Sequence, residues 1–172
     1  GVARNVTAGV SNNSASSMRA NATLSDKNYS VQVNCTDQLG NVGPSAPIFL
    51  VVDTAAPTVN VNASLNNSRT TNTQPLISFN FTDALSLTAT CTLYFDGVGV
   101  NTTAGVSNGS VSTLRPTSGQ GDGNHSVRIN CTDGAGNIGP GAPIFVLIDT
   151  TGPSVFINAS LNNSFTDGNQ PT

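Results

Sequence analysis

Asparagines followed two positions later by serine or threonine are the most frequent chemically distinctive feature of this sequence. This Asn-x-Ser/Thr pattern is the acceptor signal for N-linked glycosylation. Chance placement of the 22 Asn and 40 Ser or Thr residues among 172 positions would give about five such sites, yet fourteen are present. A sequence rich in Asn and Ser only because these residues form turns is the alternative. The acceptors that we expect to carry sugar are Asn5, Asn12, Asn21, Asn28, Asn34, Asn62, Asn66, Asn80, Asn101, Asn108, Asn124, Asn130, Asn158 and Asn162.

All nine acidic residues are aspartates, and several recur at a spacing of 96 residues. One recurring pair begins a Thr-Asp-x-x-Gly-Asn turn, and another stands in an Asp-Thr-x-x-Pro segment. If the two kinds of aspartate meet at a junction, their carboxylate and carbonyl oxygens suit Ca²⁺. Asx-turns and strand-end caps explain the same aspartates without a metal. The candidate calcium ligands are Asp37, Asp53, Asp133 and Asp149.

Side chains that could catalyse a reaction are scarce. The single histidine, His125, is replaced by Tyr29 at the position 96 residues earlier, which indicates a tolerant site. The sequence has no Glu for general acid catalysis, no Cys–His pairing of the nucleophilic type and no cluster of His for a transition metal. We therefore expect a protein that is not an enzyme. It should require no cofactor, with covalent N-glycans and the Ca²⁺ considered above as its only additions.

Charge is unusually low, since only 9% of residues are Asp, Glu, Lys or Arg, against roughly a quarter in an average soluble protein. The six basic residues are scattered and the net charge is −3, which would repel a phosphate backbone and disfavours nucleic-acid binding. No apolar run is long enough for membrane insertion of this segment. Asn, Ser, Thr and any attached sugar must therefore keep the surface hydrated.

The 96-residue spacing reflects an internal repeat. Sliding the sequence by 96 positions matches residues 1–76 to residues 97–172 without a gap, with more than half of the positions identical. Self-similarity of this kind is typical of arrays of stacked or strung units. We expect residues 1–54 to be the C-terminal part of one repeat, 55–150 a complete repeat and 151–172 the N-terminal part of a third, within a longer chain.

Apolar residues alternate with period two wherever an apolar run occurs, which predicts half-buried strands. Strands are expected over residues 58–64, 76–83, 88–95, 125–133 and 143–149. The segment 97–123, rich in Gly, Ser and Thr, is expected to hold two short strands, near 104–106 and 111–114. Six or seven strands in about 96 residues predict an all-β, immunoglobulin-like (Ig-like) sandwich, with a closed barrel as the alternative. The expected core is Ile77, Phe79, Phe81, Leu93, Phe95, Val127 and Ile129.

The order of these motifs, a Thr-Asp-x-x-Gly-Asn turn, a Pro-led strand and an Asp-Thr-x-x-Pro linker, resembles the tandem Ig-like repeats of prokaryotic surface proteins. Those repeats form stalks of adhesins, S-layer-associated proteins and extracellular filaments, some of them rigidified by Ca²⁺. The dense Asn-x-Ser/Thr pattern and paired cysteines resemble archaeal versions.

The resemblance implies an extracellular, cell-surface structural component of a heavily N-glycosylated filament, stalk or coat. It also implies head-to-tail continuation in one long chain, or strand donation between subunits. An adhesin or carbohydrate-binding module is the alternative, although the absence of Trp and the presence of only two Tyr weigh against sugar stacking.

Cysteines are expected at two positions in each repeat, those of Cys91 and Cys131. Cys91 falls on the inward face of one predicted strand and Cys131 on that of another, and these strands are neighbours in an Ig-like sheet. We expect a disulfide between them, with buried free thiols as the alternative. Cys35 corresponds to Cys131, so its partner would lie outside this chain.

Overall fold

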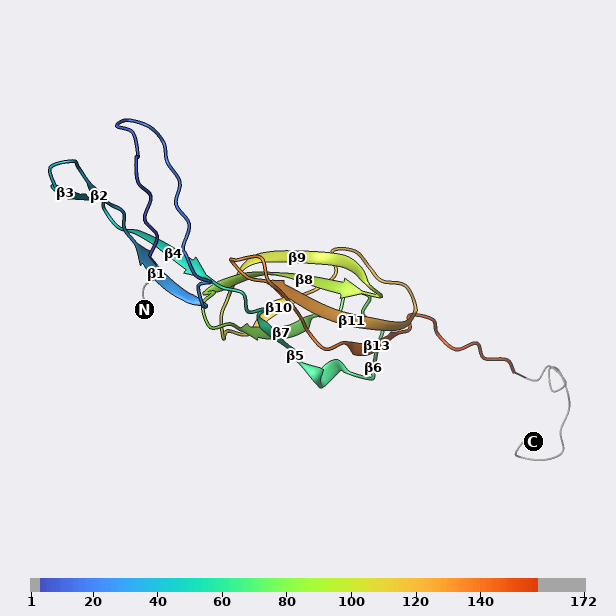
Figure 1. The fold of residues 1–172 in the computed structure, drawn as a ribbon. Coiled ribbons are helices and arrows are strands. Elements are labelled where there is room, and N and C mark those ends of the chain that lie inside the picture. The colour runs from blue at the N-terminus through green and yellow to red at the C-terminus, as the bar shows by residue number, and fades with distance from the viewer. Residues whose placement is uncertain (1–3, 158–172) are drawn as a thin grey trace, which may run out of the picture.

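The computed structural model describes residues 4–157, and almost all of its regular structure is β. Figure 1 shows a hairpin region, a sandwich and an extended C-terminal stretch following one another, with the sandwich in the middle. The helical structure in this part of the chain is a single 3-10 turn, Ala63–Leu65. Within residues 4–157, no helix has the length and hydropathy needed to cross a membrane.

Two sheets pack face to face in the sandwich. The first has the strand order β10-β7-β5 and the second β6-β13-β11-β8-β9, with β12 paired to the end of β11. Every pairing in the sandwich is antiparallel except that of β6 with β13. The strands are β5 (Thr58–Val61), β6 (Ser68–Thr70), β7 (Ile77–Thr82), β8 (Thr88–Phe95), β9 (Val98–Ser107), β10 (Ser112–Leu114), β11 (Gly123–Thr132), β12 (Ile138–Pro140) and β13 (Ile144–Ile148).

The core lies between the two sheets and follows the predicted alternation. In β7 and β8 every second residue is buried, because successive side chains of a strand point to opposite faces. None of the seven predicted core residues is more than 2% exposed. The prediction of an Ig-like sandwich is confirmed.

Of the two short strands expected between residues 97 and 123, the one near 111–114 is confirmed as β10, but the other is much longer than predicted. Instead of a short strand near 104–106, β9 spans ten residues and forms the sheet edge beside β8. Val98, Val100, Ala104 and Val106 of β9 alternate in the sequence, but only Val106 is buried, and two register shifts against β8 interrupt the strand. Strand β6 lies outside the strands expected from the sequence, because its sequence SRT is polar, as the position of β6 at a sheet edge allows.

The N-terminal hairpin region repeats part of the sandwich without its covering sheet. Strand β1 (Lys27–Val31) pairs with β4 (Ile48–Val52), and β2 (Asn34–Thr36) pairs with β3 (Val42–Pro44). The same pairings join β11 to β13 and to β12, 96 residues later. Ile48 is 65% exposed whereas its counterpart Ile144 is 4% exposed, since no described strand covers the hairpin face.

Candidate functional site

Three aspartates meet at the N-terminal end of the sandwich, where the chain arrives from the hairpin region. The carboxylates of Asp53, Asp83 and Asp133 each offer an oxygen, and these oxygens all lie within 4.8 Å of one another. Each residue directly follows a strand, namely β4, β7 or β11, so the strand ends position the cluster. Among the described residues no Lys or Arg forms an ion pair with these carboxylates.

Asp133 is the buried member of the cluster and is held by its own turn. Its Oδ1 accepts hydrogen bonds from the backbone N–H groups of Ala135 and Asn137, both at 2.9 Å. Burial alone would raise the pKa of Asp133, but hydrogen bonds from the Asn137 side chain and from the turn backbone outweigh it and lower the pKa. The carboxyl group is therefore ionised at neutral pH, as a cation ligand must be.

The linker dipeptide Asp53–Thr54 is held from both sides. On the sandwich side, Asn137 Nδ2 donates to the Asp53 carbonyl oxygen at 3.1 Å, and Ser86 Oγ donates to Asp53 Oδ2 at 3.3 Å. On the hairpin side, Thr54 Oγ1 donates to Asp26 Oδ1 at 2.9 Å. The linker is thus tied to the unit before it and to the unit after it.

The same linker contact is made again at the opposite end of the sandwich. Asp122 Oδ1 accepts from Thr150 Oγ1 at 2.7 Å, and Asp122 Oδ2 accepts from Thr151 Oγ1 at 2.8 Å. Hydrogen bonds from the Thr150 and Thr151 side chains lower the pKa of Asp122. Because Asp122 and Thr150 correspond to Asp26 and Thr54, the contact follows the 96-residue repeat.

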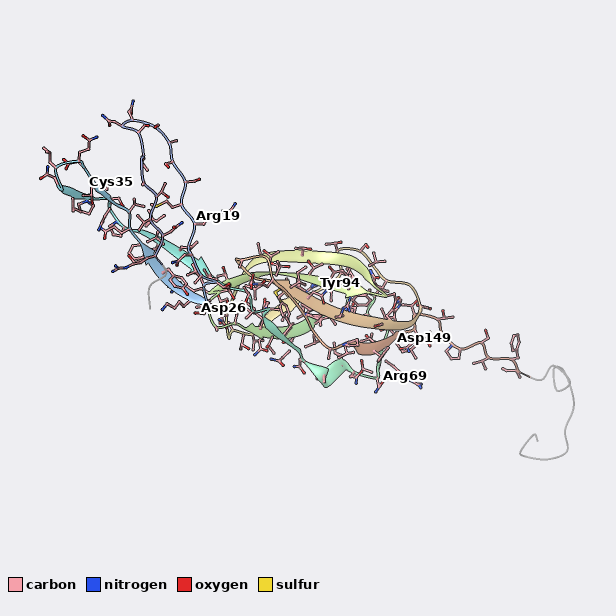
Figure 2. The ribbon with its side chains drawn as sticks, viewed as in Figure 1. Arg19, Asp26, Cys35, Arg69, Tyr94 and Asp149 are labelled. Carbon is pink, nitrogen blue, oxygen red and sulfur yellow. A yellow bond between two sulfur atoms is a disulfide. The ribbon has the colours of Figure 1, made fainter. Side chains whose placement is uncertain are left out.

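The cluster brings together two of the four predicted calcium ligands. Asp37 accepts hydrogen bonds from its own turn instead, and Asp149 lies at the opposite end of the sandwich (Figure 2). Asp83 was not identified from the sequence, because its counterparts 96 residues away lie beyond the 172 positions and repetition could not mark it. The sequence feature that could have identified Asp83 is the Thr-Asp pair at the end of its predicted strand, because Asp37 and Asp133 also follow a Thr at the end of a strand.

A disulfide joins Cys91 of β8 to Cys131 of β11, as expected. The two residues are direct cross-strand partners, with their Cα atoms 4.1 Å apart, and both are fully buried. Cys35, the counterpart of Cys131, is exposed on the N-terminal hairpin region and forms no disulfide within the described residues (Figure 2).

A family model of the bacterial Ig-like domain matches residues 58–150, which is just over half of the chain. The chain belongs to the bacterial Ig-like domain family. Among solved structures it is similar to the fibronectin(III)-like modules of Clostridium thermocellum CbhA, at 14% identity and a TM-score of 0.46, over 73% of this chain and 64% of that one. The chain therefore spans less than two thirds of that structure's length. No curated protein matches the chain.

Ig-like domains are typically non-catalytic, and the fold is consistent with a structural or adhesive module of the cell surface. The single histidine of this Ig-like domain has a structural setting. His125 Nδ1 lies 2.7 Å from Asp96 Oδ2, and Nε2 lies 2.9 Å from the Gly121 carbonyl oxygen. Tyr29, at the equivalent position, donates in the same way to the Ser25 carbonyl oxygen at 2.9 Å. In both copies, therefore, the side-chain ring at this position (His125 or Tyr29) hydrogen-bonds to the backbone carbonyl oxygen of the residue four positions earlier.

The predicted glycosylation acceptors differ in their exposure and in the hydrogen bonds that their side-chain amides make. Sugar attaches to Nδ2 of asparagine, so an acceptor needs that nitrogen accessible. Asn62 and Asn66 are exposed and accept hydrogen bonds through Oδ1, from Ser64 N and Phe145 N. The exposed acceptors are Asn5, Asn12, Asn21, Asn28, Asn34, Asn62, Asn66 and Asn124, and the half-buried ones are Asn80, Asn101, Asn108 and Asn130. Asn158 and Asn162 lie outside the described residues.

Among the described acceptors, Asn108 makes the most hydrogen bonds through its side-chain amide. Its Nδ2 donates to the carbonyl oxygens of Asp83 at 2.6 Å and Ser86 at 3.0 Å, and its Oδ1 accepts from Asp83 N at 3.3 Å. These bonds fix the β7–β8 turn that carries Asp83 into the aspartate cluster. Asn130 is also constrained, since its Oδ1 is buried without a partner in the described structure.

Proposed function

We propose that this chain is a structural unit of an extracellular, N-glycosylated filament, stalk or cell-surface coat built from tandem Ig-like repeats. The observation that carries the proposal is the doubly held linker. Asp53 is bonded to Asn137 of the sandwich while Thr54 is bonded to Asp26 of the preceding hairpin region. A repeat joined in this way has a set orientation to its neighbour, which a filament or stalk needs and a freely jointed string lacks.

N-glycans would complete such a surface. Three acceptors with free amide nitrogens, Asn62, Asn66 and Asn124, are exposed on the sandwich. Ser68, the hydroxyl residue of the Asn66 acceptor signal, has its Oγ buried without a hydrogen-bond partner in the described structure. Burying an unpaired hydroxyl destabilises a fold, so a requirement for the acceptor signal explains why serine is there. The archaeal type of surface protein fits this density of acceptors.

Calcium is the second addition that the proposal includes. A Ca²⁺ ion takes six to eight oxygen ligands, mostly carboxylate and carbonyl oxygens. Asp53, Asp83 and Asp133 offer three carboxylates without a positively charged partner in the described chain, which fits a hard cation. Bound there, the ion would neutralise their mutual repulsion and hold the linker aspartate against the two aspartates of the sandwich. It would therefore stiffen the junction.

The exposed face of the N-terminal hairpin region supports head-to-tail association. Its apolar side chains correspond to buried core residues of the sandwich, as Leu50 does to Val146. An uncovered sheet face and edge of this kind is completed by further strands. A longer covalent chain supplies them most simply, and strand donation by a second subunit is the other route.

The role in a surface structure is tested by immunogold electron microscopy on the producing cells, with an antibody raised against the chain. The proposal expects gold on surface fibres or on a surface coat. Gold confined to the cell interior would contradict it. Glycopeptide mass spectrometry of the same native material would test the sugars, and bare Asn62, Asn66 and Asn124 would remove glycosylation from the proposal.

Calcium is tested separately by calorimetric titration of the chelator-treated chain with CaCl₂. We expect saturable binding and a higher melting temperature, since a ligand at 100 times its Kd adds about 2.7 kcal/mol to the stability of the state that binds it. Asp83→Asn should abolish both effects, whereas Asp149→Asn, outside the cluster, should retain them. Equal responses of the two variants would place any calcium elsewhere.

A candidate surface for the adhesin alternative is a shallow hollow of about 200 Å³ lined by Tyr94, Gly97, Ser126, Arg128 and Pro143. The Arg128 guanidinium lies 5.7 Å from the centre of the Tyr94 ring, so the aromatic face that would stack on a sugar is already covered. A glycan array probed with the chain should therefore show no saturable binding. Binding that Tyr94→Ala removes would favour the adhesin.

A further inference from the structure

Asparagine is a heat-labile residue, and an asparagine or aspartate that directly precedes a glycine is especially prone to spontaneous cyclisation. The backbone nitrogen of the glycine gives up its proton and bonds to the side-chain Cγ of the preceding residue, because no Cβ on the glycine hinders the approach. Asn then loses its Nδ2 as ammonia, Asp loses a carboxyl oxygen as water, and a cyclic succinimide remains. Water opens the succinimide to aspartate or to isoaspartate, whose backbone contains an extra methylene group.

Four such pairs lie within residues 4–157, and all of them are in the sandwich. They are Asp96–Gly97, Asn108–Gly109, Asp122–Gly123 and Asp133–Gly134. A fifth pair, Asp167–Gly168, lies outside the described residues. At the positions 96 residues earlier, Asn12, Asp26 and Asp37 precede Asn, Lys and Gln instead. The labile pairs of the described chain are therefore concentrated in the complete repeat.

Turn geometry favours the glycine in two of these pairs. Asp96 and Gly97 join β8 to β9 with φ angles of 50° and 83°, and the two-residue turn with positive φ at both positions favours the sequence Asp-Gly. Gly109 has a φ of 74°, in the left-handed region that is unfavourable for most residues with a Cβ. Replacing either glycine to remove the labile pair would therefore strain its turn.

Hydrogen bonds hold the carboxyl group of each aspartate in its ionised form. Asp96 Oδ1 accepts from Ser126 N at 2.8 Å, and Asp96 Oδ2 lies 2.7 Å from His125 Nδ1. Both oxygens of Asp122 accept from the linker threonines, and both oxygens of Asp133 accept from its own turn. Burial would raise the pKa of Asp96 and Asp133, but their hydrogen bonds outweigh it, and hydrogen bonds likewise lower the pKa of Asp122. A carboxylate is a poor electrophile, so few of these groups are in the protonated form that cyclises.

Asn108 and Gly109 are held on both sides of the bond that would form. Asn108 Nδ2 donates to the carbonyl oxygens of Asp83 and Ser86, and Asn108 Oδ1 accepts from Asp83 N. Gly109 N, the attacking nitrogen, donates to the Phe81 carbonyl oxygen at 2.9 Å. Cyclisation must break these contacts first, because the glycine nitrogen has to turn toward Cγ and Nδ2 has to leave.

We infer that the folded domain blocks succinimide formation at its four described Asn-Gly and Asp-Gly pairs, so that these links react only when their turns open. The protecting hydrogen bonds also position the fold, since those of Asp122 hold the linker and those of Asn108 hold the β7–β8 turn. Chemical ageing of the domain is then set by how often these turns open and not by the number of labile links. The property belongs to the sandwich itself, wherever the protein is located.

The test is accelerated ageing of the full 172-residue chain, produced without glycans and kept with a chelator so that no bound cation contributes. One sample is folded, and a second is reduced and held in guanidinium chloride at the same pH and temperature. Peptide mapping by mass spectrometry measures deamidation at Asn108 and isoaspartate at each of the four pairs. Because each side chain must first leave at least two hydrogen bonds, conversion in the folded chain should be slower by about tenfold or more.

A double variant tests whether the hydrogen bonds give the protection. Thr150→Val combined with Thr151→Val removes the two hydroxyl groups that donate to the exposed Asp122. In the folded chain this change should raise isoaspartate formation at Asp122 several-fold. The other three pairs should convert at their parental rates, which makes them internal controls for the stability of the sandwich.

Gly134→Gln is the control for the chemistry, because Gln38 occupies the equivalent position in the other copy of this turn. An added Cβ at Gly134 would meet only Ser86 Oγ, at 3.8 Å, which is an ordinary contact. The larger residue hinders the attacking nitrogen, so isoaspartate at Asp133 should form more slowly than in the parent chain when both are in denaturant.

The inference is overturned if the folded and denatured chains convert at equal rates, or if the double variant leaves the rate at Asp122 unchanged. It is also overturned if the double variant speeds all four pairs alike, because the local hydrogen bonds would then not be the protecting feature. Four pairs that stay intact even in denaturant would contradict it too, since there would be no reaction for the fold to block.

Discussion

Gly139 of β12 packs directly against the carbonyl oxygen of Pro57, so that even a single added methyl group would overlap that oxygen. The linker residue Pro57 therefore packs directly against β12 of the sandwich. We expect Gly139→Ala to cost about 1–3 kcal/mol or more, because overpacking forces the backbone apart. Chemical denaturation of the two chains measures the difference.

Gly43 supplies the matched control for this substitution, since it occupies the equivalent position on β3 and an added Cβ would meet nothing within 4 Å. Gly43→Ala should leave the denaturation midpoint of the sandwich unchanged. A Gly139→Ala chain as stable as the parent would mean that the linker can move away from β12 at little cost.

Loss of the disulfide should destabilise the sandwich substantially. Replacing Cys91 and Cys131 together by Ala removes a cross-link between two central strands, and such losses in small domains typically cost 2–5 kcal/mol. The drop in melting temperature can be followed by circular dichroism. Cys35→Ala should have no effect, because that thiol is exposed and unpaired in the described structure. An unchanged melting temperature in the double variant would contradict the structural role.

Stability should depend on pH through His125. Burial would lower its pKa, but hydrogen bonds with the Gly121 carbonyl and with Asp96 outweigh burial and raise the pKa above the ordinary value of 6.5. Stability from a raised pKa is complete below the unfolded-state value and is lost as the pH rises through the folded-state value. The melting temperature should therefore fall as the pH rises from about 6.5.

His125→Tyr provides the comparison, because Tyr29 makes the same carbonyl contact without titrating in this range. The variant should lack this pH dependence. Asp96→Asn should bring the His125 pKa, measured by nuclear magnetic resonance, back toward its ordinary value. A parent chain whose melting temperature is flat between pH 6 and pH 8 would show that the ion pair contributes nothing.

Asn108 and Asn124 should behave oppositely although both carry the acceptor signal. The Asn108 amide nitrogen already makes two hydrogen bonds, and a sugar would displace one of them. We expect Asn124 to be glycosylated and Asn108 to be bare in glycopeptides from the native protein. In the unglycosylated chain, Asn108→Ala should cost about 1–3 kcal/mol through unpaired buried groups, and Asn124→Ala close to none. A sugar on Asn108 would overturn this assignment.

The sequence was sufficient to predict the sandwich and its core, because a strand that is buried on one face must alternate. Phe79 and Phe81 show this directly. It was not sufficient for the length of β9, because Gly, Asn and Thr separate its alternating small apolar residues, only Val106 is buried and two register shifts interrupt its pairing with β8. Edge strands need neither apolar residues nor a regular period, so composition alone makes them look like loops.

The candidate site was predictable only as far as repetition reached. Asp53 and Asp133 were marked by their counterparts, whereas Asp83 has no counterpart within the 172 positions. Repetition of a residue indicates that it has a structural or functional role, but it does not show which residues surround it. In this cluster the neighbours are determined by where the ends of β4, β7 and β11 come together. The acceptor pattern had the same limit, since Asn108 and Asn124 look alike until their hydrogen bonds are known.

Because the chain has few charged residues, its fold should depend little on the salt concentration of the surrounding solution. Within residues 4–157 the one ion pair is that of His125 with Asp96, so dissolved salt has little attraction to screen. Strand ladders, a covalent cross-link and neutral amide contacts are almost indifferent to ionic strength. Apart from any calcium bound at the linker, the fold should keep the same shape in fresh water and in brine.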